Sequence, residues 1–125
     1  MSVTGKTEAG FTLLEMLVVL AATALVAGLG WPMAERAIAG AQFRTVAAEA
    51  EARLIETRAR AISGGAPATF APPREPGTAR WSLPRGGIVF HPDGSASGGE
   101  VALALEGRSA RFAIDSATGA VRKIP

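Results

Sequence analysis

The sequence predicts an α+β protein, with one long N-terminal helix packed on a small antiparallel β-sheet. Three observations support this prediction. An almost unbroken apolar stretch covers residues 11–34, and a pattern of helical period follows it to residue 63. Short apolar runs separated by turn residues then fill the chain from residue 78 onward. The 125 residues are enough for one small domain but not for two.

The apolar stretch is long enough to cross a membrane. Glu15 is its one charged residue, and residues 16–34 have none. At about 1.5 Å per residue, this length spans a hydrocarbon core of ~30 Å. A cleaved secretory signal would have a shorter apolar core that ends at a small-residue site. A plain anchor would leave Glu15 unexplained, because a carboxylate costs up to ~3 kcal/mol inside a membrane. We therefore expect residues 11–34 to be the transmembrane half of the helix.

A specific string opens this stretch: Gly10-Phe11-Thr12-Leu13-Leu14-Glu15-Met16-Leu17. It resembles the processing site of type IV pilins and type II secretion pseudopilins. The resemblance implies that prepilin peptidase cuts between Gly10 and Phe11, removes residues 1–10 as a leader, and methylates the new N-terminus at Phe11. Glu15 would be fifth in the mature chain, where the family has its assembly glutamate. Pro32 would be twenty-second, where many members have a helix-kinking proline.

Residues 35–63 predict the amphipathic half of the helix. Apolar residues recur there at helical spacing, namely Phe43, Val46, Ala50, Leu54 and Ala61. Glu49 with Arg53 and Glu56 with Arg60 are i,i+4 pairs, which we expect on a solvated face. Gly64-Gly65 should end the helix, and residues 64–77, rich in proline and glycine, should form a loop.

Residues 78–125 predict a β domain of short strands in an antiparallel meander. The expected strands are 79–83, 87–91, 101–106, 110–115 and 120–124. So small a sheet cannot bury a core by itself, so we expect the amphipathic half of the helix to form its second layer. Residues 88–95, 98–103 and 118–122 resemble the C-terminal domain of H-type minor pseudopilins and their pilus relatives. This resemblance implies a pilin-like fold.

No pattern in the sequence predicts catalysis, a metal site or a cofactor. The chain has no cysteine, which excludes disulfides, thiol catalysis and cysteine-ligated metals. His91, the single histidine, flanks the turn sequence Pro92-Asp93-Gly94, and one histidine with one carboxylate is not a coordination shell. The β domain has a basic character that comes in part from Arg108, Arg111, Arg122 and Lys123. A solvated surface explains them better than DNA contact, which would depend strongly on salt.

The resemblance implies a non-enzymatic role as a minor pseudopilin. Such a protein is a structural subunit of the periplasmic pseudopilus of a type II secretion system, near its tip. Expected partners are prepilin peptidase, other major and minor pseudopilins and the inner-membrane assembly platform. The chain would cross the bacterial inner membrane once, with its C-terminal domain in the periplasm. The alternative is a minor pilin of a type IV pilus, which includes the case of a DNA-uptake adaptor, and the sequence does not separate a pseudopilin from such a pilin.

Overall fold

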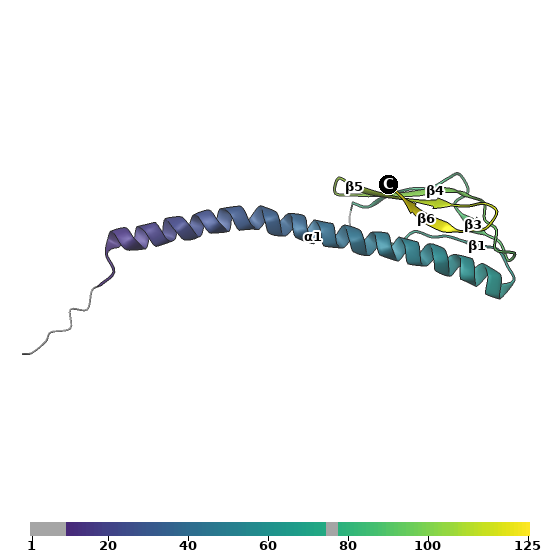
Figure 1. Cartoon of the computed structure of the whole chain (residues 1–125), viewed down its shortest axis with the longest axis horizontal. Helices are drawn as coiled ribbons and strands as arrows, with labels where there is room; N and C mark the ends of the chain where they lie inside the picture. The colour runs from purple at the N-terminus through teal and green to yellow at the C-terminus, as the bar shows by residue number, and fades with distance from the viewer. Residues whose placement is uncertain (1–9, 75–77) are drawn as a thin grey trace, which may run out of the picture. The chain divides into compact units, whose positions relative to one another are not determined.

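The computed structural model describes residues 10–74 and 78–125 (Figure 1). One helix, α1, comes first and is followed by short strands. The elements are α1 (Leu13–Gly64), β1 (Ala68–Thr69), β2 (Arg80–Ser82), β3 (Val89–Phe90), β4 (Gly99–Leu105), β5 (Arg108–Ile114) and β6 (Val121–Ile124). This order of one long N-terminal helix and small antiparallel sheets confirms the predicted α+β, pilin-like class. The chain divides into two compact units, Met1–Ile38 and Ala39–Pro125.

Thr12 sets the start of α1. Its hydroxyl oxygen accepts a hydrogen bond from the N–H of Glu15 at 3.2 Å. Its carbonyl oxygen accepts one from the N–H of Met16, also at 3.2 Å. Thr12 is therefore the N-cap of the helix, and it satisfies a backbone donor that would otherwise have no partner. The helix begins at Leu13, two residues later than the predicted start at Phe11.

Glycine ends α1 where the sequence predicted. The helix stops at Gly64, and Gly65 has a φ of 65°, the left-handed conformation typical of the residue that follows a helix. Two exposed ion pairs lie along the preceding turns, as predicted. Arg53 lies 2.8 Å from Glu49, and Arg60 lies 2.9 Å from Glu56.

The strands form two sheets, so the prediction of a single meander is wrong. The larger sheet has the antiparallel order β2-β4-β5-β6, and a separate ribbon pairs β1 with β3. β1 lies within residues 64–77, which we expected to be a loop. The physical reason is the burial of Phe70, whose N–H donates to the carbonyl of Ile88 at 2.8 Å and holds this segment beside β3. In a meander, β3 would lie between β2 and β4. Because β2 pairs directly with β4, β3 is excluded from the larger sheet.

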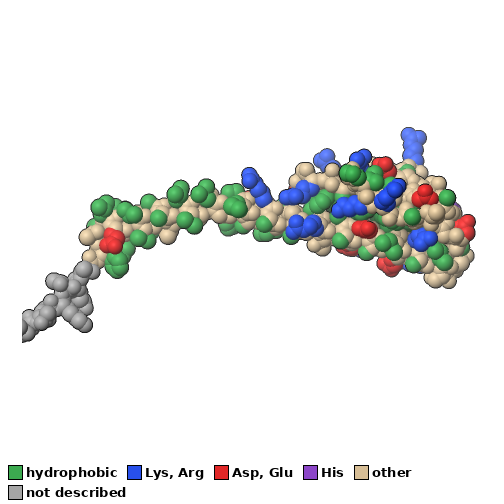
Figure 2. Space-filling model, viewed as in Figure 1, with side chains coloured by type: hydrophobic (Ala, Val, Ile, Leu, Met, Phe, Trp, Pro, Cys, Tyr) green, Lys and Arg blue, Asp and Glu red, His purple; other side chains and the backbone are tan. Residues whose placement is uncertain are grey.

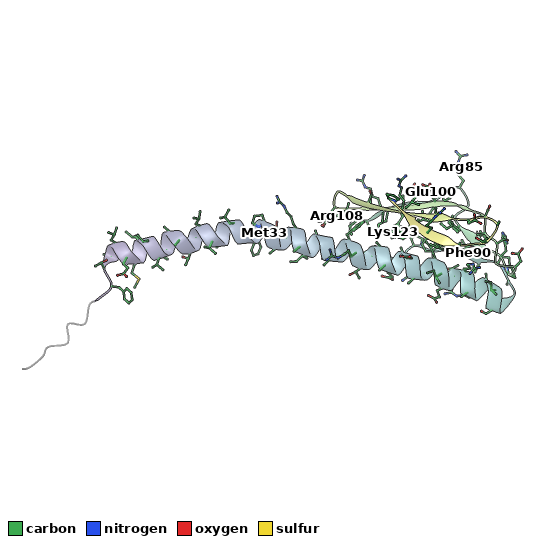
Figure 3. All side chains as sticks on the ribbon, in the orientation of Figure 1. Met33, Arg85, Phe90, Glu100, Arg108 and Lys123 are labelled. Atoms are coloured by element: carbon green, nitrogen blue, oxygen red, sulfur yellow. The ribbon has the colours of Figure 1, made fainter. Side chains whose placement is uncertain are left out.

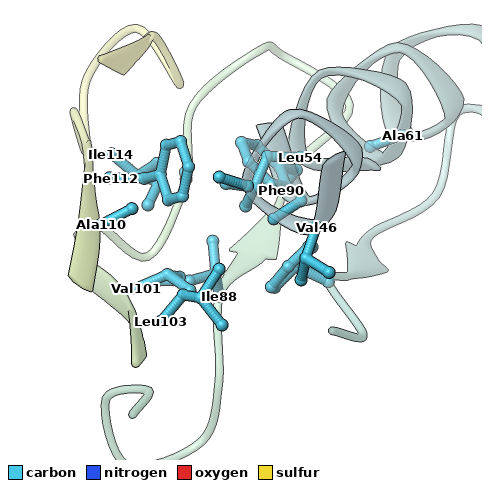
Figure 4. Close-up of a cluster of buried hydrophobic side chains, with 14 residues drawn as sticks. Val46, Leu54, Ala61, Ile88, Phe90, Val101, Leu103, Ala110, Phe112 and Ile114 are labelled. Carbon is cyan, nitrogen blue, oxygen red and sulfur yellow. The ribbon is translucent and has the colours of Figure 1, made fainter. Parts of the chain in front are cut away.

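One hydrophobic core fills the unit Ala39–Pro125 (Figure 4). Alternate residues of β4 and β5 point into it, as the buried Val101, Leu103, Ala110, Phe112 and Ile114 show. The helix contributes Val46, Ala47, Ala50, Leu54 and Ala61, and the remaining buried members are Phe70, Ile88, Phe90 and Ala96. The second layer predicted for the sheet is therefore confirmed, with Leu54 fully buried at its centre.

Candidate processing and assembly site

The predicted cleavage bond lies outside the helix. Gly10 and Phe11 have no regular secondary structure and precede the N-cap Thr12. The side chain of Phe11 is 72% exposed, and an added side-chain carbon at Gly10 would meet no atom within 4 Å. The described residues thus leave the backbone on both sides of the Gly10–Phe11 bond open to an approaching protein.

Glu15 is the acidic residue in the first turn of α1. Its backbone N–H is held by the hydroxyl of Thr12, and its side chain is exposed. Negative charge is favoured in this turn, because unpaired N–H groups give the helix start a partial positive charge. Thr12 and Glu15 have the spacing of a capping box, T-x-x-E, which is the local signal in the sequence for a helix that begins at Leu13.

Pro32 lies inside α1 and far from the residues around the predicted cleavage bond. It is seventeen positions beyond Glu15 along the helix, so the structure does not gather the four predicted site residues into one place. Proline has no N–H, and the carbonyl of Gly28 therefore lacks its usual helical donor. The helix kink at Pro32 remains a prediction.

The large apolar side chains near the start of α1 are not covered by any part of the chain that the structure describes. Leu13, Leu14, Leu17, Leu20, Leu25, Val26 and Leu29 are all more than half exposed. The helix contains an 18-residue window apolar enough to cross a membrane by length and composition, and none of that window is buried. Figure 2 shows hydrophobic side chains all along this part of the helix. Such a surface needs a partner other than water.

A second uncovered surface lies on α1 within the unit Ala39–Pro125. Small and apolar residues repeat there at alternating spacings of four and three, and all are exposed. We call this set the exposed stripe: Ala41, Thr45, Ala48, Ala52, Ile55, Ala59 and Ile62. Alternating spacings of four and three are those of a helix seam that packs against another helix. Most members are alanine, which allows two backbones to approach closely.

The four basic residues that we weighed for DNA contact, among six in residues 78–125, do not form one patch. All four are exposed, but neighbouring positions of a strand point to opposite faces of a sheet. Arg111 and Arg122 lie on the outer face, whereas Lys123 pairs with the inward-facing Phe112. Arg108 lies against Gly40 of α1, where its guanidinium nitrogen would be 3.3 Å from an added side-chain carbon. Figure 3 labels Arg108 and Lys123 among the side chains of the β domain. These four charges are therefore divided between the two faces of the sheet.

His91 flanks a turn, as predicted. Its carbonyl accepts from the N–H of Gly94 at 3.0 Å, and its own N–H donates to the carbonyl of Ser95 at 2.9 Å. The hydroxyl and the backbone N–H of Ser95 both donate to the carboxylate of Asp93. Both bonds hold the pKa of Asp93 below its ordinary value, and the bond from the hydroxyl has the larger effect.

A similar turn joins β5 to β6. The carboxylate of Asp115 accepts from the backbone N–H of Thr118 at 2.8 Å, from the Thr118 hydroxyl at 3.0 Å and from the N–H of Ala117 at 3.0 Å. These bonds, led by the Thr118 backbone, lower the pKa of Asp115. The carboxylates of Asp93 and Asp115 therefore accept hydrogen bonds that stabilise the backbone of their own turns.

The start of the chain matches a known family. Residues 5–31 match the family described as the prokaryotic N-terminal methylation motif. This range includes Gly10, Phe11 and Glu15 and ends one residue before Pro32. This match supports a protein of the prepilin class.

A comparison with curated proteins narrows this class. Over 93% of its length, the chain is 29% identical to type II secretion system protein H of Xanthomonas campestris pv. campestris, and the alignment covers 83% of that protein. Together the two matches support a prepilin-type family similar to type II secretion system protein H. No solved structure matches the chain.

Proposed function

We propose that the chain is a minor pseudopilin, a structural and non-enzymatic subunit of the periplasmic pseudopilus of a type II secretion system, near the tip of the filament. The similarity to type II secretion system protein H over most of the chain supports the pseudopilin role. The methylation motif and the uncovered apolar helix support a single-pass protein of the inner membrane. In this proposal, residues 11–34 cross the membrane, and the domain that follows lies in the periplasm.

Prepilin peptidase is the first partner in this proposal. It cuts between Gly10 and Phe11, releases residues 1–10 as a leader and methylates Phe11. The position of this bond before the N-cap supports the assignment, because a peptidase binds backbone that is not already occupied by helical hydrogen bonds. The cut gives Phe11 a new amino group one helical turn from Glu15.

The exposed stripe is the observation that best supports a subunit of a filament. It lies on α1 away from the core, so the helix can pack on the sheet with one face and on a neighbouring subunit with the other. Glu15 then pairs with the amino group of a neighbour, because a carboxylate in the lipid is costly without a partner. The neighbours are other major and minor pseudopilins, delivered by the inner-membrane assembly platform.

The proposal is tested first by the mass and the N-terminal sequence of the protein extracted from membranes. Loss of residues 1–10 and one added methyl group on Phe11 are expected. Gly10→Val should block the cut because the bulkier residue stands next to the bond, whereas Gly5→Val in the same leader should be processed. An intact leader in cells that contain the peptidase would contradict the prepilin assignment.

Cross-linking tests the role in a filament. Because the chain has no cysteine, one introduced cysteine is a unique point of attachment. Ala52→Cys, in the exposed stripe, should cross-link to another pseudopilin in cells that assemble the secretion system. Arg53→Cys is the matched control, because it is also exposed but points to a different face of the helix. Equal cross-linking from both positions would count against packing through the stripe.

A further inference from the structure

A hydrogen bond marks the end of the apolar part of α1. The indole N–H of Trp31 donates to a carboxylate oxygen of Glu35, one turn further on, at 2.7 Å. The ring itself is 72% exposed. Glu35 is the first charged residue after Glu15, and Arg36 follows it directly. The aromatic ring therefore lies between the last apolar turn and the first charged turn of the helix.

Such a pair fits the boundary between the acyl chains and the headgroups of a bilayer. A tryptophan ring prefers this level because its body is apolar and its N–H seeks a polar partner. Glu35 is expensive to bury in hydrocarbon, so it belongs in the hydrated headgroup region. The hydrogen bond points the polar edge of the ring along the helix toward Glu35 and away from the uncharged stretch.

We propose that Trp31 and Glu35 form an anchor that fixes the level at which α1 leaves the lipid. The partner is the headgroup region of a phospholipid bilayer, with the ring of Trp31 at its inner boundary and the carboxylate of Glu35 in its water. This inference rests on the proposed membrane span and adds where that span ends.

The length of helix before Trp31 agrees with this level. Residues Leu13–Gly30 rise by about 27 Å, which is close to the hydrocarbon thickness of ~30 Å. When Trp31 lies at one boundary of the hydrocarbon, the start of α1 lies close to the opposite boundary. Glu15 then lies within one helical turn of that second boundary rather than in the middle of the lipid.

The anchor also accounts for a proline directly beside it. Pro32 leaves the carbonyl of Gly28 without its helical donor, and an unpaired carbonyl costs several kcal/mol in hydrocarbon. Gly28 and Gly30 lack side chains that would cover the backbone there, and an added side-chain carbon at either would meet no atom within 4 Å. This carbonyl lies within one helical turn of the headgroups, where water can reach it and replace the missing bond.

Tryptophan fluorescence tests the anchor in the full chain reconstituted in phospholipid vesicles. The chain has two tryptophans, so Trp81→Phe leaves Trp31 as the single reporter. Lipids with bromine near the headgroup end of the acyl chain should quench Trp31 more strongly than lipids with bromine near the terminal methyl. Trp31→Phe is the control, and its remaining Trp81, in the β domain, should be quenched by neither lipid.

The pairing with Glu35 is tested in the same Trp81→Phe background. Glu35→Gln keeps an oxygen that accepts the indole N–H and should keep the quenching pattern. Glu35→Leu removes the acceptor and lengthens the apolar stretch, so Trp31 should move toward the terminal-methyl bromines. Strongest quenching by the deep bromines in the chain with Glu35 intact would overturn the anchor alone. Absence of quenching by either lipid would overturn both the anchor and the proposed membrane span.

Discussion

The guanidinium of Arg58 donates a hydrogen bond to the carbonyl oxygen of Thr118 at 3.0 Å and so joins α1 to the turn between β5 and β6. Its Nε also reaches the carbonyl oxygen of Gly94, at 3.5 Å, in the turn that follows β3. Gly119 lies between these groups. A side-chain carbon at Gly119 would collide with the Gly94 carbonyl and lie 2.9 Å from Nε of Arg58. The two turns and the helix therefore meet where there is no room for a side chain.

Gly119→Ala should destabilise the β domain through this contact, and Gly65→Ala is its matched control. Both glycines have a φ of 65°, but an added carbon at Gly65 would meet no atom within 4 Å. Gly65→Ala should lower the free energy of unfolding by about 1–2 kcal/mol, the cost of the left-handed conformation alone. Gly119→Ala should lose about 1–3 kcal/mol more, because the collision must be relieved. Urea unfolding followed by Trp81 fluorescence, with Trp31→Phe, measures the difference, and equal losses would contradict the contact.

Leu54→Ala should lower the free energy of unfolding by about 2–5 kcal/mol. Leu54 is fully buried, so the shortened side chain leaves a cavity between α1 and the sheet. Its neighbour Ile55 is 56% exposed and gives the matched control. Ile55→Ala should change the same unfolding curve by no more than about 0.5 kcal/mol. A loss for Leu54→Ala as small as that for Ile55→Ala would show that the helix does not pack on the sheet in this way.

The stability of the domain should fall in acid in part because of Asp115. The pKa of Asp115 is lowered from 3.8 in the folded protein, so the unfolded chain binds a proton more readily. The stabilisation is therefore complete above about pH 4 and is lost as the pH falls through the lowered folded pKa. Asp115→Asn should reduce the difference between the free energies of unfolding at neutral and acid pH. Ser116→Ala, which leaves the carboxylate and its partners in place, should keep that difference, and an unchanged difference in Asp115→Asn would contradict the prediction.

Glu15→Ala should leave membrane insertion and leader removal intact, because the apolar stretch only becomes more apolar. Recruitment into the pseudopilus should fall, since the carboxylate can no longer pair with the amino group of a neighbour. Processing and co-purification with other pseudopilins, measured in the same cells, separate the two effects. Glu56→Ala removes a carboxylate from the solvated face and should assemble as the unaltered chain does. Normal assembly of Glu15→Ala would show that Glu15 is only a tolerated polar residue at the edge of the membrane.

Local signals in the sequence predicted most of the fold. The paired glycines at 64 and 65 ended the helix as expected, and the turn residues between strands located β2, β3, β4, β5 and β6 within a few positions. The ribbon that β1 forms with β3 was not predictable in this way, because β1 lies in a segment that we expected to be a loop. Each of its strands has two residues, and their pairing depends on where Phe70 is buried in the finished core.

The same contrast between local and long-range signals holds for the candidate site and for Arg58. The motif around Gly10, Phe11 and Glu15 is local, and its residues could be named from their order alone. Arg58 could not be singled out, because in the sequence it resembles Arg53 and Arg60, which pair within the helix. Its partners are 36 and 60 residues further along the chain, and only the folded domain brings them to it.

The predominance of alanine in the exposed stripe has a kinetic consequence for the proposed filament. Hydrophobic stabilisation grows with the apolar area removed from water, and each alanine removes little. In a single subunit that is not yet assembled, exposure of the stripe to water therefore costs little free energy. For the same reason, each contact along the stripe holds a neighbour weakly. A subunit held through the stripe alone would therefore dissociate more readily than one held by larger apolar side chains.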